Sequence, residues 1–424
     1  MKIKTKNLSF DKVQALPKAK HIDPKYPNIL FRTLVRLLAI PDLIKTRFSF
    51  TFDEKIKQEK GPFLILMNHS SFLDLEIASR IFYPMPYSIV CTSDGFIGKN
   101  WLMRQLGCIP TQKFVTDMTL IRDMRFALKK LNSSILMYPE ASYSFDGTAT
   151  TLPENLGRLM KLLDVPVITV ITQGAFAFDP LYNCLQQRKV KVSATVKCLA
   201  TQEEVRTLDA EELTARLEKE FSFDNFAWQK ENSVKITEPF RADGLERILY
   251  KCAHCGSEGT MKGKGTTVKC SACSKEYFLD ELGQLNALDG DTEFSHIPSW
   301  YAWEREQVKK ELVDGTYELD TKVKIGVMTN FDTIYFIGSG RLIHNNEGFR
   351  LTSDDGLLSY SQKPHASYGL YSDYYWYELG DVISIGDKNC LYYCFPEKDG
   401  VVAKTRLAAE ELFKLDKENS KKNK

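Results

Sequence analysis

Short apolar runs alternate with segments of helical period through the first half of the chain. The apolar runs are typical of buried strands, at 63–67, 134–137, 166–171 and 190–198. The periodic segments predict helices at 118–131, 156–163 and 209–221. Strands separated by helices predict an α/β fold with a mixed or parallel sheet that is covered on both faces. We place this domain at residues 51–239.

The pattern changes to short strands with many aromatic residues from about Thr316 onward. Strands are predicted at 323–328, 333–337, 348–352, 374–379, 382–385 and 390–395, separated by Gly, Asn and Asp turns. A helix at 405–415 and a solvated basic tail at 417–424 follow. Several antiparallel strands before one helix predict a small barrel or sandwich, pleckstrin-like in outline, within a β-rich C-terminal domain at 286–424.

An apolar segment at 29–40 lies within an N-terminal region, residues 1–50, that shows no signal-peptide pattern. A helix of this length spans roughly 18 Å, too little for a hydrocarbon layer of about 30 Å, and Pro41 is expected to end it. Arg32 and Arg36 fall on one stripe of that helix. The pattern predicts an interfacial helix whose arginines reach lipid phosphates, or equally a helix packed on its own domain.

Two polar segments follow the first two predicted strands. Asn68-His69-Ser70-Ser71-Phe72-Leu73-Asp74 comes after the first, and residues 138–147, Tyr-Pro-Glu-Ala-Ser-Tyr-Ser-Phe-Asp-Gly, come after the second. Open α/β sheets carry their chemistry at the carboxyl ends of strands. Both segments are therefore candidate parts of one active site.

His69 and Asp74 form a candidate catalytic pair. If a helix begins at Ser70 or Ser71, His69 lies in the turn and Asp74 in the first helical turn, so the side chains can meet. Asp74 would fix the imidazole tautomer and leave the other nitrogen as a general base. Backbone amides at the helix start could stabilise an oxyanion. The alternative is a capping histidine beside an aspartate that complements the helix dipole.

With these motifs the chain resembles the glycerolipid acyltransferases, typified by 1-acyl-sn-glycerol-3-phosphate (lysophosphatidate) acyltransferase. That family carries Asn-His-x-x-x-x-Asp and, downstream, Phe-Pro-Glu-Gly-Thr-Arg-Ser, which residues 138–144 match in register. Two weaker family blocks are matched in order by 107–113 and 165–170. The resemblance implies a glycerol-phosphate-acyltransferase-like fold, with His69 as base and Asp74 as its orienting partner.

The chain departs from the family where the family binds the acceptor's phosphate. Two family arginines are replaced here by Lys113 and Tyr143, a point charge and a neutral hydroxyl. Glu140 is kept, and Ser142 stands at the threonine position. The resemblance implies that Lys113, Glu140, Ser142 and Tyr143 hold the acceptor. For Glu140, a carboxylate that caps backbone amides is the alternative.

Cysteine spacing predicts a zinc ribbon at residues 249–285. Cys252 and Cys255 form one Cys-x-x-Cys knuckle. After fourteen intervening residues, Cys270 and Cys273 form another. Four thiolates at this spacing predict a structural Zn²⁺ site with no open coordination position. Two disulfides or a redox pair are the alternatives, and a reducing cytoplasm disfavours the disulfides.

Composition and charge fit an ordinary globular enzyme. The 424 residues carry 57 Lys and Arg against 55 Asp and Glu, which gives no electrostatic case for nucleic acid. We predict an O-acyltransferase that uses acyl-CoA or acyl-carrier protein, acts on a lysophospholipid in phospholipid biosynthesis, and sits peripherally on the cytoplasmic face of the membrane. The ribbon or the C-terminal domain could contact a protein partner. The alternatives are a glycolipid or non-phosphorylated acceptor, or a non-catalytic lipid-binding or zinc-dependent interaction protein with a degenerate acyltransferase domain.

Overall fold

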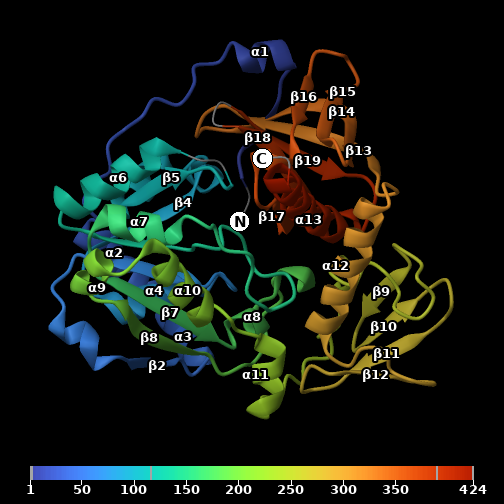
Figure 1. Ribbon diagram of the computed structural model, residues 1–424, viewed down its shortest axis with the longest axis horizontal. Coiled ribbons are helices and arrows are strands. Elements are labelled where there is room, and N and C mark those ends of the chain that lie inside the picture. Colours follow the sequence, from blue (N-terminus) through green and yellow to red (C-terminus); the bar gives the residue numbers. More distant parts are fainter. Residues whose placement is uncertain (1–2, 115–116, 388–389, 423–424) are drawn as a thin grey trace. The chain divides into compact units, whose positions relative to one another are not determined.

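The computed structural model describes residues 3–114, 117–387 and 390–422. The chain divides into two compact units, both drawn in Figure 1. One holds residues 21–180 and 186–235, and carries the histidine motif. The other holds residues 1–20, 181–185 and 236–424, and carries the cysteine knuckles.

A seven-stranded mixed sheet forms the centre of the first unit, in the order β2-β8-β7-β3-β6-β4-β5. Its strands are β2 (Ser49–Phe52), β3 (Leu64–Met67), β4 (Tyr87–Thr92), β5 (Cys108–Thr111), β6 (Ser134–Met137), β7 (Val167–Gln173) and β8 (Ser193–Ala200). Pairing is parallel except between β7 and β8. The carboxyl ends of β3 and β6 are neighbours, so the two polar segments of the sequence begin side by side.

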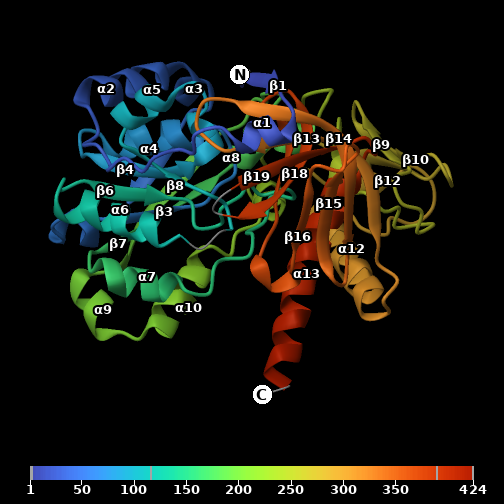
Figure 2. The same ribbon diagram turned by 90° about the horizontal axis from the view of Figure 1, so that it is seen from above.

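Helices cover both faces of this sheet (Figure 2). They are α2 (Ile29–Leu38), α3 (Ile40–Lys45), α4 (Asp74–Phe82), α5 (Asn100–Gln105), α6 (Met118–Lys129), α7 (Leu156–Leu163), α8 (Ala175–Phe178), α9 (Gln202–Thr207), α10 (Ala210–Glu220) and α11 (Asn225–Glu231). Helices α2 to α5 lie on one side of the strands, and α7, α9 and α10 on the other. Apolar side chains of α6, α7 and α10 build one continuous core with those of β3, β6 and β7. The predicted mixed sheet flanked by helices is confirmed.

The second unit contains two further sheets and two long helices. Its smaller sheet has the order β12-β11-β10-β9, with β9 (Met261–Lys264), β10 (Thr267–Cys270), β11 (Glu276–Leu279) and β12 (Leu285–Ala287). The larger has eight strands: β1 (Thr5–Asn7), β13 (Leu319–Met328), β14 (Ile334–Asn345), β15 (Gly348–Ser353), β16 (Ser359–Gln362), β17 (Tyr371–Trp376), β18 (Gly380–Asp387) and β19 (Cys390–Pro396). The helices are α1 (Phe10–Gln14), α12 (Ile297–Val313) and α13 (Val401–Lys422).

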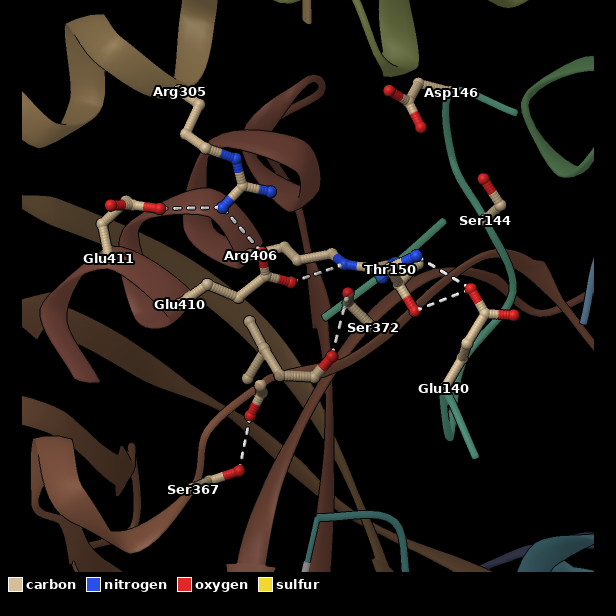
Figure 3. Close-up of polar contacts among 12 residues, drawn as sticks. Glu140, Ser144, Asp146, Thr150, Arg305, Ser367, Ser372, Arg406, Glu410 and Glu411 are labelled. Atoms are coloured by element: carbon tan, nitrogen blue, oxygen red, sulfur yellow. Dashed lines mark hydrogen bonds and ion pairs between the residues drawn. The ribbon is translucent and has the colours of Figure 1, made fainter. Parts of the chain in front are cut away.

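Seven strands of the larger sheet form two antiparallel meanders joined where β13 pairs with β19, and β1 pairs in parallel with β14. One meander runs β13-β14-β15-β16 and the other β17-β18-β19, and α13 follows both. The β-rich C-terminal region with one closing helix is therefore confirmed in outline. Buried ion pairs fasten its two long helices, since Arg305 of α12 contacts Glu411 of α13 at 3.0 Å (Figure 3).

The helix predicted at 29–40 ends at Leu38, ahead of Pro41. Pro41 lies in the first turn of the next helix, α3, where its missing N–H costs no helical hydrogen bond. Two other local predictions are wrong. The strand predicted at 374–379 stops at Trp376, since Tyr377 and Glu378 adopt left-handed φ angles of 46° and 63° in a turn. The polar tail continues α13 to Lys422, because lysine and glutamate are good helix formers.

Candidate active site

The turn after β3 is anchored at its start by Asn68, which is fully buried. Its Oδ1 accepts a hydrogen bond from the backbone N–H of Thr172 at 2.7 Å, and its Nδ2 donates to Ser70 Oγ at 3.1 Å. Asn68 thereby joins the carboxyl end of β3 to that of β7 and shapes the turn that holds His69.

His69 and Asp74 are in direct contact. Imidazole Nδ1 lies 3.0 Å from Asp74 Oδ2, and that oxygen also accepts the backbone N–H groups of Ser70 and Ser71 at 2.9 and 3.1 Å. Helix α4 begins at Asp74 itself, later than the predicted start at Ser70 or Ser71, yet Asp74 still lies in the first turn. With Nδ1 donating to the carboxylate, Nε2 is the nitrogen that can accept a proton.

Burial sets the protonation of this pair. The His69 side chain is 17% exposed and that of Asp74 is 1% exposed. Burial lowers the pKa of His69 well below 6.5, and the positive charge of Lys113 acts in the same direction. Burial acts to raise the pKa of Asp74, whereas the amides of Ser70 and Ser71 and the Nδ1–H of His69, all directed at Oδ2, favour its charged form. The imidazole is therefore neutral at physiological pH, the form a general base requires.

The predicted oxyanion site at the start of the helix is wrong. The amides of Ser70 and Ser71 donate to Asp74, and the amide of Leu73 donates to Ser71 Oγ at 2.9 Å. The amide of Asp74 donates to the Ser71 carbonyl, and that of Phe72 to Asp179. Each of these N–H groups is already used to fold the turn around Asp74.

Aromatic rings cover the base. The ring of Tyr143 stacks on His69 with centroids 3.7 Å apart, and that of Tyr138 stacks with centroids 4.1 Å apart. Phe72 stacks in turn on Tyr143 at 5.4 Å and is 56% exposed. The tyrosine at the family's arginine position therefore lies directly on the catalytic candidate.

Glu140 joins the two polar segments through backbone amides. Its Oε2 accepts the N–H of His69 at 3.0 Å, and its Oε1 accepts the N–H and the hydroxyl of Thr150 at 2.8 and 3.2 Å (Figure 3). Burial raises its pKa to about 7. These contacts favour the capping alternative, in which Glu140 shapes the site. A second link has the same effect, because Ser144 N–H donates to the His69 carbonyl at 3.1 Å.

The remaining predicted acceptor residues lie around this pair to different extents. Ser142 is buried, 1% exposed, within the segment that Glu140 fixes. Lys113 follows β5, and its charge acts on the pKa of His69, so it belongs to the same neighbourhood. Arg104, a further cation near the motifs, is committed elsewhere, since its guanidinium donates to the Ile22 carbonyl at 2.9 Å.

Asp179 is a buried residue of the site that sequence reasoning missed. Its Oδ1 accepts the hydroxyl of Ser71 at 2.5 Å, and burial raises its pKa to about 8. Asp179 thus holds the turn through the hydroxyl of Ser71, and Asp74 holds it through the amides of Ser70 and Ser71. No local pattern marks Asp179, because it lies 108 residues along the chain from Ser71.

The four knuckle cysteines come together in the second unit. Cys252 Sγ lies 3.8 Å from Cys273 Sγ, Cys255 Sγ lies 3.8 Å from Cys270 Sγ, and all four lie within 4.8 Å of one another. A disulfide would need about 2.05 Å, so the disulfide alternative does not describe this arrangement. Tetrahedral Zn²⁺ with Zn–S bonds of about 2.3 Å places its sulfurs about 3.8 Å apart. The cluster therefore fits a metal ion with four thiolate ligands.

A mixed α/β sheet with a His–Asp pair at a central strand end is the arrangement expected of an acyl-transfer domain. Residues 47–173 match the family model described as Acyltransferase. These residues therefore form a domain of the acyltransferase family, as the sequence motifs predicted.

Two relatives make the comparison more specific. The chain is 25% identical over 150 residues to human (Homo sapiens) 1-acyl-sn-glycerol-3-phosphate acyltransferase beta, a match over 35% of this chain and 53% of the relative. It thus spans about half the length of that relative. The crystal structure of the 1-acyl-sn-glycerophosphate (LPA) acyltransferase PlsC from Thermotoga maritima matches with 16% identity and a TM-score of 0.35, over 44% of this chain and 76% of that one.

Proposed function

We propose that this protein transfers a fatty acyl group from the thioester of acyl-CoA or acyl-carrier protein to a hydroxyl of a lysophospholipid. The observation that most directly supports this proposal is the buried His69–Asp74 contact at 3.0 Å, which lies at the end of β3 inside the matched domain. The name of the human relative makes 1-acyl-sn-glycerol-3-phosphate the first acceptor to consider.

In the proposed mechanism, His69 Nε2 takes the proton of the acceptor hydroxyl while the oxygen of that hydroxyl attacks the thioester carbonyl. The new ester forms as the carbon–sulfur bond breaks, and the imidazolium returns the proton to the leaving thiolate. Asp74 stabilises the imidazolium through its contact with Nδ1. Asn68, Glu140 and Asp179 keep the turn in place without touching the reacting atoms.

Mass-spectrometric product analysis tests the proposal. Purified protein is incubated with acyl-CoA and a panel of lysophosphatidate, lysophosphatidylcholine, monoacylglycerol and a glycolipid alcohol. We expect one acceptor to gain one acyl chain while free CoA appears in equal amount. Release of CoA without an acylated product, or no reaction with any acceptor, would contradict the proposal.

A second candidate is transfer to an acceptor without a phosphate monoester. The specific observation is that Tyr143, which stands where the family has arginine, packs on His69. A neutral phenol cannot form the charged, bidentate contact that an arginine makes with phosphate.

Substitutions at Lys113 and Tyr143 separate these two candidates. If lysophosphatidate is the acceptor, Lys113→Ala should raise its KM about tenfold and leave the KM for acyl-CoA unchanged, since a charged hydrogen bond contributes roughly 1.5–3 kcal/mol. Tyr143→Arg should then lower the KM for lysophosphatidate, because the arginine can form a charged contact with the phosphate. Unchanged lysophosphatidate kinetics in both variants, with a better neutral acceptor in the panel, would favour the second candidate.

We further propose that α2 and α3 attach the enzyme peripherally to the cytoplasmic face of the membrane. Their apolar side chains are exposed to solvent: Ile29, Leu30, Leu34, Leu37, Leu38, Ile40 and Ile44. Trp101 of α5, 66% exposed, packs edge-on against Phe31 and extends this apolar face. An exposed helical face of leucines with an adjacent tryptophan is typical of an interfacial anchor.

The two arginines of α2 contact their own domain, as the second of the two alternatives for this helix predicts. Arg32 donates to the Pro84 carbonyl at 2.8 Å, and Arg36 lies over the ring of Tyr83 at 4.3 Å. Both contacts hold the helix on its own domain and leave its leucines outward. In the part of the chain that the structure describes, no helix is long and apolar enough to cross a membrane.

Vesicle binding should therefore depend on the leucines. The double variant Leu34→Asp/Leu37→Asp is expected to lower binding to phosphatidylcholine–phosphatidylglycerol vesicles at least about tenfold, since burying one leucine contributes about 1.5–3 kcal/mol. Leu288→Asp, at an equally exposed leucine of the second unit, is the matched control. Equal co-sedimentation of the unmodified protein, the double variant and Leu288→Asp with the vesicles would contradict the proposed attachment through α2 and α3.

A further inference from the structure

The two tyrosines of the 138–144 segment lie on opposite faces of the His69 imidazole. Both rings are nearly parallel to it, with interplanar angles of 27° and 21° and centroids within 4.1 Å. Two rings whose centroids lie this close to the imidazole centroid, in nearly parallel planes, cannot both lie on the same face of the imidazole. Two tyrosine rings side by side at van der Waals contact would need more room than one imidazole face offers. The imidazole is therefore sandwiched between Tyr138 and Tyr143.

The segment that carries these rings is tied to the backbone of the same histidine. Glu140 accepts the N–H of His69, and Ser144 donates to the His69 carbonyl. Tyr138 follows β6 directly, and β6 pairs with β3, which precedes His69. The base and its two covering rings thus belong to one hydrogen-bonded frame.

We propose that Tyr138 and Tyr143 are positioning residues that clamp His69 and stabilise the imidazolium formed when this base takes the acceptor's proton. The proposal rests on the proposed acyl transfer and assigns both tyrosines a part in it. The face of an aromatic ring attracts a cation, and more strongly where water is excluded. The cation would arise between two such faces, with Asp74 at its Nδ1 edge.

This arrangement also determines how an acceptor can approach. With both faces covered by rings and Nδ1 engaged by Asp74, the Nε2 edge is the direction left for the reacting hydroxyl. Burial makes the charged imidazole costly, as the lowered pKa of His69 indicates. A neutral ring that stabilises the cation without hydrating it suits that requirement better than an arginine, which would repel it.

Three variants of Tyr143 separate the effect of an aromatic ring from the effect of covering His69 with any side chain. Tyr143→Phe keeps the π face and is the reference for the other two variants. Tyr143→Leu covers the histidine without a π face, and its kcat should fall about tenfold at unchanged acceptor KM. Tyr143→Ala admits water, so the acidic limb of the kcat/KM profile should move upward toward pH 6.5. Tyr360→Leu, at a tyrosine of the β-rich region, is the matched control and should leave kcat unchanged.

A spectroscopic measurement keeps the test independent of turnover. Titration of the His69 ring by NMR should give a lower pKa in Tyr143→Leu than in Tyr143→Phe, by about one unit. Equal kcat and equal His69 pKa in the Leu and Phe variants would overturn the clamp. If no acceptor is acylated but the two pKa values differ as expected, the clamp stands and the proposed transfer fails.

Discussion

Replacing His69 by alanine is expected to lower acyl transfer at least about a hundredfold while the protein stays folded. General-base catalysis contributes about 10²- to 10⁴-fold, and the loss should appear in kcat because the base acts on the reacting hydroxyl. The KM values should change little. Initial rates of CoA release with the best acceptor, together with circular dichroism of the variant, make the measurement.

His21 offers a matched control for that variant. It too contacts a carboxylate, since its Nε2 lies 2.9 Å from Asp123 Oδ2, but it is more exposed and lies outside the motif. His21→Ala should keep turnover within about twofold of the unmodified protein. Near-normal acylation by His69→Ala would remove the mechanism, and an equal loss in both variants would point to a structural cause.

Asp74→Asn examines the same mechanism through the charge of the partner. The asparagine oxygen can take the place of Oδ2, which faces Nδ1 and the amides of Ser70 and Ser71, but it carries no negative charge to stabilise the imidazolium. The backbone amides of Ser70 and Ser71 keep an oxygen acceptor in this variant. Turnover should therefore fall about a hundredfold with little change in melting temperature.

Local chemistry explains why the sequence predicted the centre of the site. Strands β3 and β6 are continuous apolar runs, and the His69–Asp74 spacing spans one turn, so both are visible in a short window. The contacts of Glu140 with His69 and of Asp179 with Ser71 are not visible, because they join segments 71 and 108 residues apart. Their contacts exist only once the sheet brings strand ends together.

Helix α12 is not predicted from the sequence, because a buried charged residue interrupts the apolar pattern of its buried side. Its buried side repeats every four residues through Trp300, Glu304, Val308 and Leu312, so a carboxylate interrupts the apolar stripe. In the folded unit Glu304 accepts the N–H of Lys251 at 2.7 Å, at the first cysteine knuckle. A pattern that counts glutamate as a surface residue cannot anticipate that partner.

Through that contact, a metal ion held by the four cysteines would support packing beyond the knuckles. Trp300 packs edge-on against Tyr277 of β11 and donates its indole N–H to the Lys251 carbonyl at 3.0 Å. Lys404 of α13 pairs with Glu258 at 2.8 Å, between the two knuckles in sequence. The cysteine region is therefore packed on α12 and α13 within the second unit, which favours a stabilising role over a nucleic-acid surface.

We therefore expect close to one zinc ion per chain, and a lower melting temperature by at least about 10 °C in Cys252→Ser/Cys255→Ser. Structural zinc contributes directly to folding, and in a unit of this size each kcal/mol shifts the melting temperature by about 2–4 °C. Cys198→Ser, at a half-buried cysteine of the first unit, is the matched control and should keep both the metal and the melting temperature.

Tryptophan fluorescence locates the effect of zinc on this packing. Because Trp300 is fully buried against Tyr277 and Lys251, removal of zinc with a chelator should shift its emission toward that of exposed tryptophan. Restored zinc should reverse the change, and Trp300→Phe should abolish most of it. A metal-free protein that melts normally and keeps its emission would show that the four cysteines do not hold a structural ion.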